Sequence, residues 1–150
     1  MALERAGRRL ALAESCTGGW VARVVTAIAG SSGWFERGFV TYSNEAKQEM
    51  LGVAAATINR HGAVSEPTAR AMAEGALARS HADVALAITG IAGPSGGTPE
   101  KPIGMVWFAW ATKENGVSVR CCQLTGDRET VRRKSVAIGL EGLLDVLRKE

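Results

Sequence analysis

Residues 82–89, ADVALAIT, form an almost continuous apolar run near the middle of a 150-residue chain. A strand with one wet face would alternate apolar and polar side chains, whereas a continuous run is typical of a central strand that is covered on both faces. The segment before it carries apolar residues at helical spacing, at positions 69, 72, 73, 76 and 77. The run therefore predicts a sheet with helices packed on both of its faces.

Four further strands and four helices are expected around this central strand. The strands are predicted at residues 8–15, 38–43, 103–112 and 116–124. The helices are predicted after the glycine pair at 18–19, at 44–51, after Ser65, and from about residue 127 to the end. Helical crossovers suit parallel pairs, whereas the short KENG turn at 113–116 pairs its two strands antiparallel. The sequence thus predicts one α/β domain over residues 1–150, a three-layer α/β/α sandwich on a mixed, mostly parallel five-stranded sheet.

Helix ends and faces can be assigned in the same way. Ser43 or Asn44 is expected to cap the helix at 44–51, and Gly52 is expected to end it. Ser65 is expected to cap the next helix, with Pro67 in its first turn. The last helix is expected to bury one apolar stripe, formed by Val136, Leu140, Leu143, Leu144 and Leu147.

Composition removes several classes of function. Aromatic residues are only 5% of the chain, and the net charge is +3, so no nucleic-acid surface is expected. The basic groups at residues 5–9 and 128–134 are interpreted as solvated faces. No apolar stretch approaches the roughly 20 residues that span a bilayer, so no membrane segment is expected. Three oddly spaced cysteines favour a reducing cytoplasm, and two distant histidines give no metal site.

Reactive residue types lie at the ends of three of the predicted strands, where open α/β sheets place their ligand sites. The end of the first strand supplies Ser15, Cys16 and Thr17 before two glycines. The end of the second supplies Tyr42, with Lys47 one turn into the next helix, and the third ends at Thr89 and Gly90. Taken singly, each has a structural explanation: a helix cap, a buried thiol, a packed ring, a solvated amine, a flexible loop. Taken together, they place a serine beside a lysine.

A serine needs a nearby base to act as a nucleophile, and no histidine is well placed to supply one. A lysine can do so if burial lowers its pKa. Ser–Lys hydrolases often use an extra hydroxyl to relay protons, and Tyr42 and Thr89 are the candidates for that relay. N–H groups near the start of the following helix could stabilise an oxyanion or a phosphate.

Five segments resemble the CinA C-terminal domain family, the nicotinamide-nucleotide amidases: AESCTGG, GFVTYSNEAK, GAVSEPTARAMAEGA, TGIAGPSGGTPEKPIG and GDRETVR. They occur in the family's order and cover nearly the whole chain. The resemblance implies an α/β/α fold on a mixed five-stranded sheet. It also implies hydrolysis of the carboxamide of nicotinamide mononucleotide to nicotinate mononucleotide and ammonia. No cofactor is expected.

The resemblance places the family's nucleophile on Ser15 and its lysine base on Lys47, with Tyr42 and Thr89 orienting and relaying. Cys16 is then expected to pack behind the nucleophile. An oxyanion site is expected at the N–H groups of Cys16, Thr17, Gly18 and Gly19. Asn44 and the glycine loop that opens at Gly90 are expected to line the nucleotide pocket, and Arg128 or one of its basic neighbours is expected to meet the phosphate.

Departures from the family pattern are few. The N-terminal helical lead is short, and Leu124-Thr125 stands where an aromatic residue is common. The resemblance also implies a homo-oligomer, with a dimer favoured. The alternative hypothesis is a non-catalytic nucleotide-binding or partner module that keeps the fold without turnover.

Overall fold

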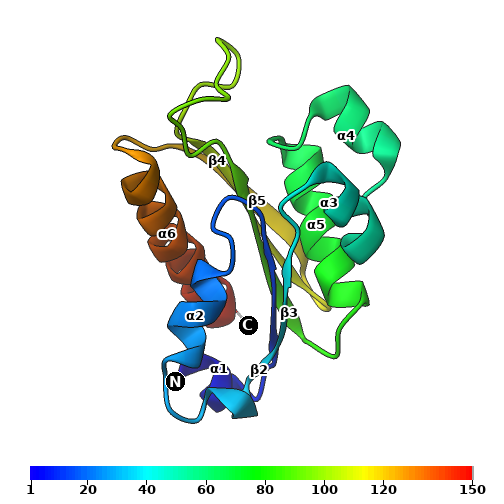
Figure 1. The fold of residues 1–150 in the computed structure, drawn as a ribbon. Helices are drawn as coiled ribbons and strands as arrows, with labels where there is room; N and C mark the ends of the chain where they lie inside the picture. The colour runs from blue at the N-terminus through cyan, green and yellow to red at the C-terminus, as the bar shows by residue number, and fades with distance from the viewer. Residues whose placement is uncertain (150) are drawn as a thin grey trace.

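A computed structural model describes residues 1–149 and contains one five-stranded sheet in the order β2-β1-β3-β4-β5 (Figure 1). The two parallel pairs are β1·β2 and β1·β3, and the two antiparallel pairs are β3·β4 and β4·β5. Four strands therefore point the same way and β4 opposes them, which confirms the predicted mixed sheet. The strands are β1 Leu10–Glu14, β2 Phe35–Val40, β3 Val84–Gly90, β4 Met105–Thr112 and β5 Gly116–Gln123.

Helices cover both faces of this sheet, as the apolar run at 82–89 predicts. In Figure 1, α2 and α6 lie on one side, and α3, α4 and α5 lie on the other. The first layer consists of α1 Ala2–Ala6, α2 Trp20–Thr26 and α6 Arg128–Arg148. The second consists of α3 Asn44–Leu51, α4 Ala55–His61 and α5 Glu66–Ala78. Among the described residues, no helix is both long and apolar enough to cross a membrane.

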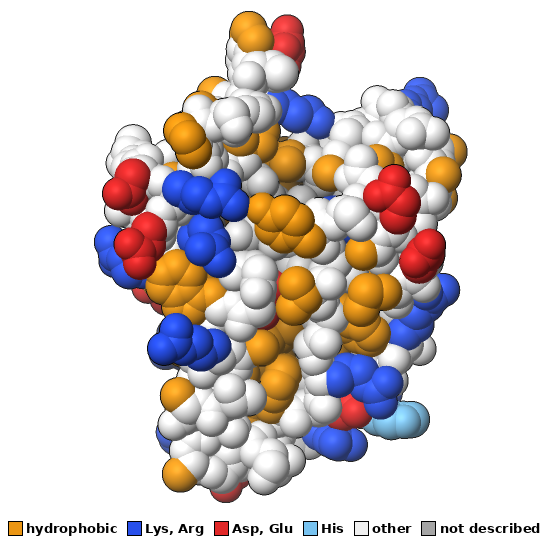
Figure 2. Space-filling model, viewed as in Figure 1, with side chains coloured by type: hydrophobic (Ala, Val, Ile, Leu, Met, Phe, Trp, Pro, Cys, Tyr) orange, Lys and Arg blue, Asp and Glu red, His pale blue; other side chains and the backbone are white. Residues whose placement is uncertain are grey.

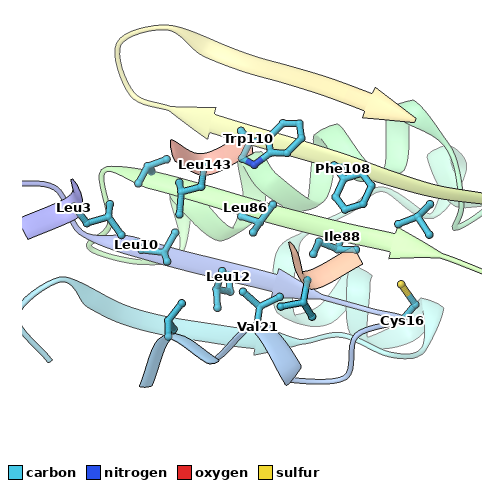
Figure 3. Close-up of a cluster of buried hydrophobic side chains, with 14 of the residues drawn as sticks. Leu3, Leu10, Leu12, Cys16, Val21, Leu86, Ile88, Phe108, Trp110 and Leu143 are labelled. Carbon is cyan, nitrogen blue, oxygen red and sulfur yellow. The ribbon is translucent and has the colours of Figure 1, made fainter. Parts of the chain in front are cut away.

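The two faces of the sheet differ sharply in side-chain size. Alternate residues of a strand point to opposite faces, so each face collects every second residue. The α2/α6 face carries large side chains (Figure 3), which are Leu10, Leu12, Leu86, Ile88, Phe108 and Trp110. At the centre of the opposite face the alternate positions are alanines, which are Ala11, Ala13, Ala85, Ala87, Ala109 and Ala111, and larger side chains such as Trp107 and Val119 pack only at its margin. Small side chains allow α5 to pack close to the sheet, against β1, β3, β4 and β5.

Close packing continues one layer further out, where α3 lies against α5. Gly75 of α5 faces the carbonyl oxygen of Leu51, the last residue of α3, and a Cβ at position 75 would clash with that oxygen. The glycine therefore fixes how near α3 can approach. This spacing matters because α3 carries Lys47.

The predicted helix ends are largely confirmed. The Ser65 hydroxyl accepts a hydrogen bond from the N–H of Thr68, and Pro67 lies in the first turn of α5. Of the two candidate caps of α3, the structure selects Ser43, whose hydroxyl accepts from the N–H of Ala46. Gly52 ends α3 in the left-handed conformation, with φ at 69°.

Three details of the sequence prediction were wrong. Strand β2 occupies 35–40 instead of 38–43, because the pairing with β1 begins at Leu10 and Phe35. Helices α1 and α4 were not predicted. Leu144 is 40% exposed and leaves the expected buried stripe, whereas Val136 and Leu143 of α6 are buried as expected.

Candidate active site

The carboxyl ends of β1, β2 and β3 meet at one edge of the sheet, because these three strands are parallel. A cavity of about 270 Å³ opens there and brings together residues that are far apart in the sequence. Its lining includes the predicted site residues Ser15, Cys16, Tyr42, Asn44, Lys47, Gly90 and Arg128. The expectation that strand ends gather the reactive side chains agrees with this arrangement.

Lys47 reaches the cavity from α3 and is only 1% exposed, which is unusual for a lysine. Its Nζ lies 3.0 Å from Ser15 Oγ and donates to the carbonyl oxygens of Thr41 at 2.9 Å and Tyr42 at 3.2 Å. Burial disfavours the charged amine and lowers the pKa of Lys47 below its usual range. The Ser15 hydroxyl therefore faces an amine that gives up its proton more easily than a solvated lysine would.

The segment after β1, residues 15–19, is named here the nucleophile loop, and Glu14 holds it from the inside. Glu14 is 2% exposed, and its carboxylate accepts hydrogen bonds from the Thr17 hydroxyl at 2.7 Å and from the N–H groups of Val21 at 2.9 Å and Ala22 at 3.0 Å. Sequence reasoning gave Glu14 no role. An acidic residue at the end of an otherwise apolar strand was the available signal, because a buried carboxylate must be paired or hydrogen-bonded.

The backbone N–H groups of the nucleophile loop are not equivalent. The N–H of Ser15 donates to Ile88, and the N–H of Gly18 donates to Ser15. Within residues 1–149, the N–H groups of Cys16, Thr17 and Gly19 donate to no other residue. Of the four expected oxyanion donors, Gly18 is thus engaged within the loop and the other three N–H groups are uncommitted. Cys16 lines the cavity, whereas Thr17 and Gly19 line a neighbouring pocket.

Cys16 follows Ser15 but faces the core. It belongs to the hydrophobic cluster between the sheet and the α2/α6 layer (Figure 3). Burial raises the pKa of its thiol to about 12, so the reactive thiolate is scarce at neutral pH. The side chain fills space behind the loop, in line with the structural explanation considered from the sequence.

Tyr42 and Arg128 meet at the mouth of the cavity. Tyr42 is 61% exposed, and its hydroxyl accepts a hydrogen bond at 3.0 Å from Nη2 of Arg128. Nη1 of the same guanidinium donates to the carbonyl oxygen of Gly93 at 2.8 Å. It is the backbone carbonyl of Tyr42, not its hydroxyl, that contacts Lys47. In the described part of the chain, no hydrogen bond joins the Tyr42 hydroxyl to Ser15 or Lys47.

Thr89 lies at the end of β3 and is buried. Its hydroxyl donates to the carbonyl oxygen of Ala63 at 2.9 Å, and Ala63 with Val64 forms part of the cavity wall. No hydrogen bond connects Thr89 to Ser15 or Lys47 over residues 1–149. In this conformation Thr89 anchors a wall of the cavity.

The basic cluster at residues 128–134 is not a uniformly solvated face. Figure 2 shows Lys and Arg side chains gathered at the upper left of the molecule, over the N-terminal part of α6. Arg128 lines the cavity, and the half-buried Arg132 donates to the carbonyl oxygens of Cys16 and Thr17. Only Arg133, which is exposed, and Lys134, which bonds Thr125, fit the earlier interpretation. Arg132 is a residue that sequence reasoning missed.

Metal ligands are not grouped in the described residues, where no set of three or more His, Cys, Asp or Glu side chains could hold an ion. The two histidines, His61 and His81, are not among the cavity-lining residues. The chemistry available at the site is therefore that of a hydroxyl, an amine, backbone N–H groups and a guanidinium.

Comparisons with known proteins identify relatives of this chain. The chain is 58% identical over 143 residues to nicotinamide-nucleotide amidohydrolase PncC of Escherichia coli strain K12, which covers 95% of this chain and 86% of that protein. It is 48% identical over 144 residues to the protein of the same name from Pseudomonas putida, covering 96% of this chain and 89% of that protein.

A solved structure gives the same result for the fold. The competence/damage inducible protein CihA from Agrobacterium tumefaciens superposes with a TM-score of 0.93 at 46% identity, covering 96% of this chain and 87% of that one. The family model described as the CinA C-terminal domain matches residues 1–147. This chain therefore belongs to the CinA C-terminal domain family, as its five sequence segments indicate.

Proposed function

We propose that this protein is an amidohydrolase that converts nicotinamide mononucleotide to nicotinate mononucleotide and ammonia, a reaction of pyridine-nucleotide salvage. The observation that carries the proposal is the 3.0 Å contact between Nζ of the buried Lys47 and Oγ of Ser15. The names of the relatives from E. coli and P. putida support the same substrate and reaction.

The hydrogen bonds around Lys47 suit a general base. A neutral amine has two N–H donors and one lone pair, and two backbone carbonyls, those of Thr41 and Tyr42, accept the two donors. The lone pair then faces the Ser15 hydroxyl, which becomes the donor. Protonation adds a third N–H, which can donate to Oγ in turn. The same three partners therefore satisfy the amine before and after it takes the proton.

The reaction follows in two stages. Ser15 Oγ attacks the carboxamide carbon while Lys47 removes its proton, and Lys47 then gives that proton to the leaving nitrogen as ammonia departs. A water molecule attacks the resulting ester, Lys47 takes its proton, and Ser15 leaves with that proton restored. Nicotinate mononucleotide is released, and the enzyme returns to its starting state.

The developing oxyanion requires donors that are not already committed. The N–H groups of Cys16 and Thr17 meet this condition and immediately follow the nucleophile. Each well-placed donor of this kind stabilises the transition state by roughly 3 kcal/mol. Gly19 remains a further candidate.

Substrate binding is assigned to the rest of the cavity lining. Arg128 is the cation placed to meet the nucleotide phosphate, because its guanidinium stands at the cavity mouth beside Tyr42. Asn44 and Gly90 line the pocket for the nucleotide. Tyr42 and Thr89 orient the substrate and its surrounding wall, and a proton relay through either hydroxyl requires a rearrangement when substrate binds.

The test is ammonia release from nicotinamide mononucleotide by purified protein without added metal, with nicotinate mononucleotide measured as the second product. We expect equal amounts of both products and no change on addition of EDTA. Substrate binding without ammonia release would support the non-catalytic nucleotide-binding module instead. Loss of activity with EDTA, restored by a divalent ion, would contradict the metal-free mechanism.

Two further expectations accompany this function. All three cysteines, Cys16, Cys121 and Cys122, are free thiols, which suits the predicted cytoplasmic location. A homo-oligomer, with a dimer favoured, is expected from the family resemblance. Light scattering coupled to size-exclusion chromatography measures the mass in solution and tests this expectation directly.

A further inference from the structure

Two arginines on α6 point toward the candidate site and contact different parts of it. Arg128 and Arg132 are four residues apart, so they lie on the same face of the helix. Arg128 reaches the cavity, whereas Arg132 ends at the nucleophile loop. Its Nε donates to the carbonyl oxygen of Cys16 at 3.0 Å, and Nη2 donates to that of Thr17 at 3.2 Å.

The Arg132 guanidinium contacts backbone carbonyls and an aromatic ring. Its guanidinium carbon lies 5.4 Å from the centre of the Trp20 ring, in a cation–π contact. Within residues 1–149, no carboxylate forms an ion pair with it. A rigid fork with two donors, stacked on a ring, is suited to holding two neighbouring peptide groups in fixed orientations.

Fixing these peptide groups also fixes the peptide group that follows Ser15. The peptide bonds of the loop are trans, so each C=O points opposite to the N–H of the next residue. When Arg132 holds the Thr17 carbonyl, the Gly18 N–H points away from α6, where it donates to the Ser15 carbonyl. Holding the Ser15 carbonyl in turn directs the Cys16 N–H.

We propose that Arg132 is a positioning residue, which orients the oxyanion-binding N–H groups of Cys16 and Thr17 by holding the carbonyls of the nucleophile loop. The inference rests on the proposed amidase function. Arg132 does not line the cavity that holds Ser15 and Lys47 but a neighbouring pocket with Thr17 and Gly19, and its hydrogen bonds to the loop carbonyls are its connection to the Ser15 site. Glu14 holds the other side of the loop through the Thr17 hydroxyl, so the loop is tied by side chains on both sides.

The first test compares Arg132→Ala with Arg133→Ala, which removes an exposed arginine from the next position of the same helix. A misplaced oxyanion site should lower kcat by about 100-fold in Arg132→Ala and leave KM within about twofold. Arg133→Ala should match the wild type. The acidic limb of the pH–kcat profile should not move in Arg132→Ala, because the contacts of Lys47 are kept.

Chemical rescue separates positioning from a general loss of packing. Millimolar guanidinium should restore part of the kcat of Arg132→Ala, whereas equal ammonium or sodium should not. Arg132→Lys, with a smaller group that cannot span both carbonyls, should fall between the wild type and Arg132→Ala. Trp20→Leu should lower kcat in the same direction, and the double variant should lose less than the sum of the two effects.

Three outcomes would overturn the proposal. Equal kcat in Arg132→Ala and Arg133→Ala would remove the role, and so would a raised KM with unchanged kcat, which would indicate substrate contact. If Arg132→Ala fails to fold, Arg132→Lys carries the same comparison. Amide hydrogen exchange gives a readout that does not depend on activity: the Gly18 N–H, which donates to the Ser15 carbonyl, should exchange faster in Arg132→Ala, and unchanged exchange would refute the proposal. If the wild type releases no ammonia, the amidase proposal fails, while the exchange experiment still tests the contact.

Discussion

Two loops rich in glycine or other small residues leave the same edge of the sheet, and they are held very differently. The nucleophile loop, residues 15–19, follows β1 and is fixed by Glu14 on one side and Arg132 on the other. The glycine-rich loop, residues 91–104, follows β3 and is tied mainly at its base, where Ile91 bonds to Met105 and Gly104. Its residues 94–100 are all exposed, and in Figure 1 it projects from the top of the molecule.

This difference separates positioning from recognition. A reacting oxygen and its oxyanion donors lose rate when they move by about 1 Å, so they belong on a segment without freedom. A loop that meets the variable parts of a substrate can be exposed and weakly tied, as binding loops commonly are. The comparison predicts that changes in the nucleophile loop and at the proposed general base, Lys47, lower kcat. Changes in the glycine-rich loop and at Arg128, which bonds to it, should raise KM.

The largest effect is expected from the same deletion made in each loop. Ser15→Ala removes the proposed nucleophile and should lower kcat by about 10⁴-fold or more, with the circular dichroism spectrum unchanged. Ser95→Ala removes a hydroxyl from the exposed loop that lines the same cavity, and should change kcat/KM by less than about tenfold. Steady-state ammonia release measures both variants. Comparable losses in the two variants would break the distinction between the loops.

A loss of kcat nearly as large is expected when Lys47, the proposed general base, is replaced. Lys47→Arg keeps a positive charge but supplies no usable base, because guanidinium does not deprotonate in proteins. We expect kcat to fall by at least about 10³-fold at every pH. Lys113→Arg, the same change at an exposed lysine of the β4–β5 turn, is the control.

The pH profile of the wild type tests the same residue. Burial lowers the pKa of Lys47, so its neutral fraction, and with it kcat, should rise with pH through that lowered pKa. An amine with the ordinary pKa of about 10.4 would place this limb far above neutral pH. Near-normal turnover in Lys47→Arg, or no acidic limb in the wild type, would assign the base elsewhere.

An intermediate effect is expected at the anchor of the glycine-rich loop. Arg128→Gln removes the cation at the cavity mouth and its hydrogen bond to Gly93. Loss of one charged contact to the nucleotide phosphate should raise KM by about 10- to 100-fold and change kcat much less. A fall in kcat with KM unchanged would place Arg128 in the chemistry and contradict the division between the two loops.

The smallest effect is expected beside the nucleophile itself. Cys16→Ala keeps the backbone N–H and removes a buried sulfur, so activity should stay within about threefold while the free energy of unfolding falls by about 1 kcal/mol. With a thiol pKa of about 12, Cys16 of the wild type should resist alkylation at neutral pH. An inactive Cys16→Ala with an active Ser15→Ala would reverse the nucleophile assignment.

Parts of the fold with a strong local pattern could be predicted from the sequence. Strands β1 and β3 are apolar until their last one or two residues, and caps such as Ser65 have side chains that satisfy helix N–H groups. Strand β2 is an edge strand with Glu36 and Arg37 inside it, so its first half lacks an apolar signal. Helix α4 was missed because only one of its residues, Ile58, is buried.

The candidate site was likewise predictable only where the sequence carries a pattern. Ser15 and Lys47 could be paired because strand ends converge at one sheet edge and the family resemblance names both. Arg132 could not be distinguished from its neighbour Arg133 by type, since only the direction of the helix face decides which one meets the loop. The hydrogen bonds of Thr89 and Tyr42 are set by tertiary placement and have no local sequence signal.

Gly75 extends the site beyond the residues that touch it. The lysine-bearing α3 lies against α5 at a distance that only a hydrogen atom at position 75 permits, because a methyl group there would meet the Leu51 carbonyl. The thickness of one methyl group therefore sets where the amine stands relative to Ser15. Selection for turnover would therefore retain glycine at position 75, although α5 supplies no group to the reaction.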